Sequence, residues 1–169
     1  MPVTPTSPLA LVCDQLRTTV SESSTFQTRT GAANAAAALA FIHYGVVTDD
    51  TGLTNQRPLA IVQIVGIGSS AVSDGIGIDL SVTGELSLVF QDDANHQTDH
   101  NDSLLDFVNF CDGVMDDLRL ASGVGDSFPI QHERMIVMPE RTMRRKRDSD
   151  NNDYWEASYL IGWGEGEEN

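Results

Sequence analysis

Apolar residues first recur at helical spacing near the N-terminus, and they predict a helix from Pro8 to about residue 21. The residues of this pattern are Leu9, Val12, Cys13, Leu16 and Val20. Ser7 and Pro8 form a typical helix start, because serine caps free amides and proline at the first helical position loses no hydrogen bond. The structure of residues 26–31 is ambiguous, and the alanine-rich residues 32–43 predict a second short helix.

In the middle of the chain the pattern of apolar residues changes from that of helices to that of β-strands, in which side chains alternate between the two faces of a sheet. Residues 59–65 are apolar on both sides apart from Gln63, as expected of a central strand. Residues 76–82 alternate between apolar and small or polar residues, which predicts a strand with one buried side. Two interpretations remain open for the next residues. Either Thr83-Gly84 turns the chain into a further strand at 85–91, or residues 76–91 form one long strand with a glycine kink.

The clearest helical pattern comes next. Ser103 and Asp106 have the spacing of a capping box, so the helix is expected to start there, and Gly123 is a natural stop. One apolar stripe of this helix is expected to face the core. It consists of Leu104, Val108, Cys111, Met115 and Leu118.

Two strand-like runs complete the chain, at residues 128–138 and 154–162, and the polar residues 139–153 between them are expected to form an extended loop. Strands interrupted by one helix indicate an α+β fold. We therefore expect an antiparallel or mixed sheet of about four strands, flanked by two main helices and carrying a long hairpin connection. The whole chain, 1–169, is expected to be one domain with an N-terminal arm (1–7) and an acidic C-terminal tail (164–169).

Composition and charge narrow the possible functions. The formal net charge of -15 disfavours specific binding of DNA or RNA, because a strongly acidic surface repels phosphate. The longest apolar run, residues 35–42, is far too short to span a membrane, and no basic residue precedes the first apolar stretch as in a secretory signal. Cys13 and Cys111 lie among apolar residues and are expected to be buried thiols in a reducing compartment, with a disulfide as the minor alternative.

Motifs for catalysis and cofactor binding are weak. Residues 66–71 match a dinucleotide fingerprint, but the residues after them alternate like a strand, so a glycine-rich connection is the better interpretation. His96 and His100 stand four residues apart among carboxylates, yet this segment precedes the expected helix cap and is rich in turn formers, which favours a polar loop over a metal site. No nucleophile elbow or phosphate-binding loop is present. We expect no catalytic residue, no cofactor and no metal.

Two charged segments stand out. Acidic residues fill the polar side of the helix that begins near Ser103, and a solvated face or a wall that repels DNA would both explain them. Half of the basic residues of the chain fall within Arg141–Arg147, in the expected loop. Three interpretations of this cationic segment are open: a solvated hairpin tip, a nuclear-localisation signal, or a surface that docks onto an acidic partner, including a second copy of the chain. The candidate interface residues are Arg141, Arg144, Arg145, Lys146, Arg147, Asp106, Asp116 and Asp117.

The order of elements, from residue 8 to 163, is similar to that of a known family. An N-terminal helix precedes a strand opened by a proline (residues 57–62), then come a strand reading Gly-Glu-Leu-Ser-Leu-Val-Phe, the helix at 104–120 and the aromatic-rich strand at 154–163. This arrangement resembles the tail terminator and tail completion proteins of long-tailed bacteriophages. The alanine-rich segment and the long connection at 139–153 distinguish this chain from smaller members of that family.

The resemblance implies a structural protein of the virion without catalytic residues. Such proteins form rings, commonly hexameric, at the head-proximal end of the tail tube, where they stop tube polymerisation and meet the head connector. The implied partners are other copies of the chain, the tail tube protein and a neck protein, with DNA passing through the ring. The alternatives are another head–tail joining protein, or a small enzyme or a ligand- or metal-binding domain with its site at residues 92–102.

Overall fold

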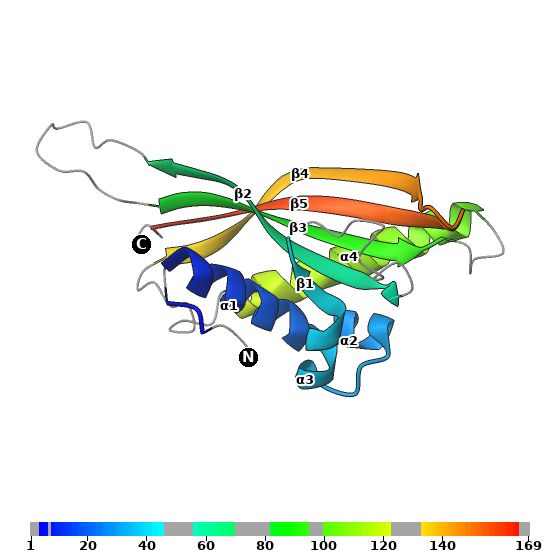
Figure 1. The fold of residues 1–169 in the computed structure, drawn as a ribbon, viewed down its shortest axis with the longest axis horizontal. Coiled ribbons are helices and arrows are strands. Elements are labelled where there is room, and N and C mark those ends of the chain that lie inside the picture. Colours follow the sequence, from blue (N-terminus) through cyan, green and yellow to red (C-terminus); the bar gives the residue numbers. More distant parts are fainter. Residues whose placement is uncertain are drawn as a thin grey trace, which may run out of the picture.

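The strands run along the longest dimension of the molecule and form one strongly twisted sheet (Figure 1). The computed structural model describes residues 4–6, 8–45, 56–69, 82–94, 100–122 and 133–165. Within them the sheet has five strands in the order β1-β2-β3-β5-β4, and only β1 and β2 pair in parallel. The strands are β1 (Ile42–Tyr44), β2 (Leu59–Ser69), β3 (Val82–Asp93), β4 (Glu133–Arg147) and β5 (Asp153–Glu165). The predicted α+β class is confirmed, with a mixed sheet.

The N-terminal third is more helical than its sequence indicates. Helix α1 (Pro8–Glu22) agrees with the prediction, and the ambiguous segment after it forms a second helix, α2 (Ser24–Thr30). The Ser23 side chain caps α2 at its start, and Gly31, at a φ of 70°, ends it in the left-handed conformation that glycine adopts without strain. The expected helix at 32–43 is only partly correct: α3 (Ala35–Ala38) gives way to a 3₁₀ turn, η1 (Leu39–Phe41), and then to β1.

Strands β2 and β3 form an antiparallel pair at the centre of the sheet. Thr83 and Gly84 lie inside β3, opposite Gly68 and Ile67, so the turn considered for this dipeptide is wrong. Residues 76–81 of the alternating run are outside the described residues. The fingerprint-like Gly66 and Gly68 belong to β2 itself, where the register shifts by a bulge, and not to a connection between strands.

Helix α4 (His100–Ser122) starts before the expected cap. Ser103 is buried, and its Oγ accepts a hydrogen bond of 2.8 Å from Trp155 Nε1 on β5. The inner side of α4 also differs from the expected stripe. Cys111, Met115 and Leu118 are buried, but Leu104 is only partly buried and Val108 is half-buried. The expected stripe missed the buried centre of this side, which consists of two aromatic residues and a valine: Phe107, Phe110 and Val114.

The loop expected at residues 139–153 is wrong. Strand β4 continues through Arg147, and β5 begins at Asp153, so only the residues between them form the turn. The ladder between β4 and β5 is interrupted once, between Val137 and Arg141, where β4 has two more residues than β5. Pro139 lies in this irregularity, because proline cannot donate to the ladder.

The helices cover one face of the sheet. Residues from α1, α2 and α4 form one core with alternate residues of the strands, and the rings of Phe26, Phe90 and Phe110 pack together within it at centroid distances of 5.5–6.3 Å. Cys13 and Cys111 are both buried, as predicted, and neither forms a disulfide. The opposite face carries a small apolar cluster of Leu59, Ile61 and Val89. None of the described helices is long and apolar enough to cross a bilayer.

Candidate functional site

The cationic segment lies on the end of β4, paired residue by residue with β5. Arg144 is opposite Glu156, and Arg147 is opposite Asp153. Because side chains alternate along a strand, Arg145 and Arg147 share the helix-covered side with Met143, which packs against the core. Arg144 and Lys146 belong to the other side. The segment is therefore the end of a strand, and not a loop that projects from the sheet.

Acids of β5 neutralise most of this cationic segment within the same chain. Arg147 Nε and Nη2 donate to the two carboxylate oxygens of Asp153 at 2.7 and 3.1 Å, and Arg145 also pairs with Asp153. The hydrogen bonds from Arg147, with those from Arg145, lower the pKa of Asp153 to about 2. Lys146 Nζ lies 2.6 Å from Glu156 Oε1. Three of the expected interface cations thus have acidic partners on the adjacent strand.

Arg144 differs from its neighbours. Its side chain is exposed and has no ion pair or hydrogen bond with any residue that the structure describes. The backbone of Arg141 pairs with Tyr159 on β5, while its side chain is outside the described residues.

The turn after β4 is fixed to the sheet by a buried ion pair. Asp148 Oδ2 lies 2.9 Å from Arg57 Nη1, and the side chains are 0% and 5% exposed. The backbone amides of Asp150 and Asn152 also donate to Asp148, at 3.0 and 2.8 Å. Burial opposes the charge of Asp148, but these hydrogen bonds and Arg57 outweigh it and lower its pKa. The Arg57 guanidinium stacks over Tyr154 at 3.7 Å from the ring centroid, so the hairpin tip is held in place.

The three candidate acids of α4 bind different partners within the chain. Asp117 reaches the start of α2, where it accepts hydrogen bonds from Ser23 Oγ at 2.6 Å and from the amide of Thr25 at 3.1 Å. These bonds outweigh the effect of burial and lower the pKa of Asp117. Asp106 pairs with Arg29 of α2 at 2.5 Å. Asp116 pairs with Arg119 at 2.8 Å along the same helix, and both side chains are more than half exposed.

The outer side of α4 is one exposed stripe at helical spacing. Its members, all exposed, are Asp102, Leu105, Asn109, Asp112, Asp116 and Arg119. Leu105 is 61% exposed, which makes it one of the two large exposed hydrophobic side chains of the described residues. The acidic face expected from the sequence is therefore exposed at three of its acids, while Asp106 and Asp117 point to α2.

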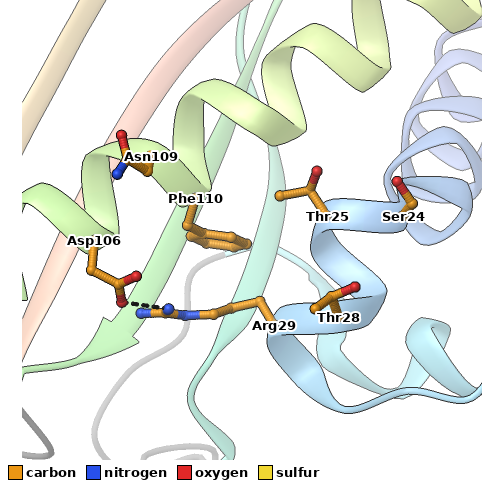
Figure 2. A pocket seen from close by; sticks show the side chains of 7 residues that line it. All are labelled: Ser24, Thr25, Thr28, Arg29, Asp106, Asn109 and Phe110. Carbon is orange, nitrogen blue, oxygen red and sulfur yellow. Dashed lines mark ion pairs between the residues drawn. The ribbon is translucent and has the colours of Figure 1, made fainter.

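A hollow between α2 and α4, of about 520 Å³, was missed in the sequence. Figure 2 shows Arg29 reaching from α2 toward Asp106 on α4, beside the ring of Phe110. Arg29 also pairs with Asp92 at the end of β3. Burial raises the pKa of Asp92, whereas the two carboxylates outweigh burial and raise the pKa of Arg29. A lone arginine in an ambiguous segment and an acid at the end of a buried strand were the available signals.

The charged residues of this hollow connect α2 to α4 and to β3, and they are not arranged as a reactive site. Its arginine is held by two carboxylates and an aromatic ring, and its other lining residues are hydroxyl and amide side chains: Ser24, Thr25, Thr28 and Asn109. Residues 95–99, with His96, are outside the described residues, and His100 is the first residue of α4. Within the described ranges, no group of three His, Cys, Asp or Glu side chains could hold a metal ion.

Comparisons with known proteins give no family. The sequence matches no family model and no curated protein. Among solved structures, a protein of Akkermansia muciniphila, described as being without its transmembrane region, is 12% identical to this chain. The match covers 99% of this chain and 91% of the other, but its TM-score of 0.26 is too low to support a shared fold.

Proposed function

We propose that this chain is a structural subunit of a bacteriophage tail, a tail terminator. Copies of the chain form a ring, expected to be a hexamer, at the head-proximal end of the tail tube. The ring stops tube polymerisation and joins the tail to the head connector. Its partners are other copies of itself, the tail tube protein and a neck protein, and its location is the virion.

The observation that carries this proposal is the order of elements around the sheet. A long helix precedes the central pair β2 and β3, and α4 separates this pair from β4 and β5. The same order underlies the resemblance to tail terminator and tail completion proteins. The two edge strands, β1 and β4, each have one edge without a partner among the described strands, and these edges remain as surfaces for neighbouring proteins.

Charge supports a ring through which DNA passes. The chain carries a formal net charge of -15, and Asp102, Asp112 and Asp116 are exposed on α4. An acidic surface repels the phosphates of DNA, so it does not retain DNA during passage. The ion pairs of Arg29, Arg57 and Arg145 connect elements within the chain, which fits a protein that acts by shape and association.

Tail length tests the proposal. The coding sequence is deleted from the phage genome that carries it, and the tails are measured by electron microscopy. Tails of uncontrolled length, restored to one length by the wild-type chain supplied in trans, support a terminator. Tails of normal length that fail to join heads contradict it and indicate the other candidate, a neck protein. Complementation with Arg119→Thr, an exposed change on α4, is the matched control and should also restore tail length.

A further inference from the structure

The outer edge of β4, which faces away from β5, lies at one end of the described sheet. Strand β4 is the last strand of the sheet and has fifteen residues, and among the described strands only β5 pairs with it. The other edge of such a strand presents unpaired backbone amides and carbonyls, which can bind a strand of another molecule. Because none of the described strands covers this edge, the chain needs a feature that prevents unwanted sheet extension.

Two features interrupt this edge. Pro139 lies in the irregular part of β4, between Val137 and Arg141, where the ladder to β5 is broken. After it comes the run Arg144, Arg145, Lys146 and Arg147. Four consecutive cations place two long charged side chains on each side of the strand. The side chains of Arg145, Lys146 and Arg147 are 41%, 38% and 61% exposed, although all three pair with acids of β5. Arg144 is also an exposed residue.

We infer that the run Arg144–Arg147 prevents the end of β4 from pairing with β4 of a second copy. In an antiparallel pair around a two-fold axis at Arg145, Arg145 would face Arg145 of the other copy, and Arg144 would face Lys146 of the other copy, because directly opposite residues point to the same side of the sheet. Directly opposite Cβ atoms lie about 4.5–5.5 Å apart, and like charges at that distance destabilise the pair. The acids of β5 lie on the inner neighbour of β4 and do not separate the two copies.

This inference goes beyond the proposed function and does not depend on it. A ring held by the cationic segment would be weakened when the cations are removed or screened. An edge guarded by the cations behaves in the opposite way: removing or screening them permits association. If removal of the cations increases association, these residues protect the edge. If it decreases association, the same residues hold copies of the chain together.

The test variant replaces three residues on one side of the sheet: Arg144→Thr, Lys146→Thr and Glu156→Thr. Lys146 and Glu156 are removed together, because they pair with each other and neither is then left with an unmatched charge. Threonine suits a strand. The net charge falls by one, and Arg119→Thr on the exposed side of α4 is the control with the same change in charge. Arg144→Lys preserves the charge at the edge and should behave as the wild type.

Sedimentation velocity and hydrogen exchange measure the outcome at low salt. We expect the weight-average mass of the triple variant to rise with concentration to roughly double that of the wild type, as for a two-fold pair. The amides of β4 should become protected from exchange in the larger species. At about 1 M salt, where charges are screened beyond roughly 3 Å, the wild type should shift in the same direction. If the triple variant does not fold, Arg144→Thr alone provides the test, because Arg144 has no described partner to lose.

Three results overturn the inference. The first is a triple variant, or a folded Arg144→Thr variant, whose mass distribution matches that of the wild type. The second is a smaller assembly than the wild type, which would show that the cations hold copies together. Association that leaves β4 unprotected from exchange also contradicts it, since the contact would then lie elsewhere.

Discussion

At the end of β4, basic residues meet acids of the adjacent strand, whereas along the outer side of α4 acidic residues are exposed to solvent. Both segments are runs of like charge in the sequence, and both were candidates for contacts between subunits. In the hairpin, Asp153 and Glu156 stand opposite the cations, and Asp148 is buried against Arg57. On α4, Asp116 pairs with Arg119, on the same exposed stripe.

This difference shows that a charge run does not reveal by itself where its charges act. The alternation of a strand brings the cations of β4 opposite acids that come soon after them in the sequence, so they stabilise a hairpin. The period of a helix instead divides the acids of α4 between two directions. Asp106 and Asp117 contact α2, while the acids of the outer stripe face solvent.

The largest expected effect distinguishes the inner side of α4 from its flank. Val114 is fully buried, so Val114→Asp places a charge in the core without a partner and should prevent folding. Val108 is half-buried, and Val108→Asp should yield a folded, destabilised protein. Circular dichroism and urea unfolding check both variants. An unfolded Val108→Asp protein beside a folded Val114→Asp protein would show that α4 packs through a different side.

The next effect compares a buried ion pair with an exposed one. Arg57→Met leaves the carboxylate of Asp148 buried without its cation, and it should lower the urea midpoint strongly. Arg119→Met breaks the exposed pair with Asp116 and should cost about 0–1 kcal/mol. Equal midpoints for the two variants would contradict the claim that the hairpin tip depends on Arg57.

A smaller effect concerns the acid that connects two helices. Asp117→Ala removes the acceptor for Ser23 and for the Thr25 amide at the start of α2, which should cost about 0.5–2 kcal/mol, as for a lost cap. Asp112→Ala, on the outer stripe of the same helix, should change the unfolding free energy by less than about 0.5 kcal/mol. The account of Asp117 is wrong if both variants unfold at the same urea concentration.

The acid sensitivity of the hairpin gives the smallest effect. The pKa of Asp153 is about 2 in the folded chain, below the ordinary aspartate value of about 3.9. Its contribution is therefore present above the unfolded pKa and is lost as the pH falls toward 2. Asp153→Asn should flatten the fall in stability between about pH 5 and pH 2. Unfolding curves across that range check this, with Asp112→Asn as the control, and an unchanged slope would contradict it.

The sequence predicted the elements with a clear period and failed where partners lie far along the chain. Helix α1 and the class of the fold were predictable from local spacing. The aromatic side of α4 was not, because Phe110 is selected by contacts with Phe26 and with Phe90 of the sheet, and Phe107 packs against Phe110. The second part of β4, residues 139–147, was mistaken for a loop, since its polar residues become suitable for a strand only when β5 supplies the acids opposite them.

The charged residues of the candidate site could be selected from the sequence, but the contacts that they make could not be predicted from it. The charged residues were correctly singled out, but Asp117 and Asp106 face α2, and three cations face β5. Arg29, which joins α2 to both β3 and α4, was missed because its partners are 63 or more residues away. Sequence spacing carries no signal for pairs at such separations.

The mass of the wild-type chain in solution tests the central claim, a self-assembling ring, most directly. Size exclusion coupled to light scattering, from dilute to concentrated protein, gives this mass without any partner. The account predicts one closed assembly of a fixed number of 18.3 kDa subunits, expected to be six, which does not grow further as concentration rises. A monomer at every concentration, or open-ended growth without a preferred size, would contradict it.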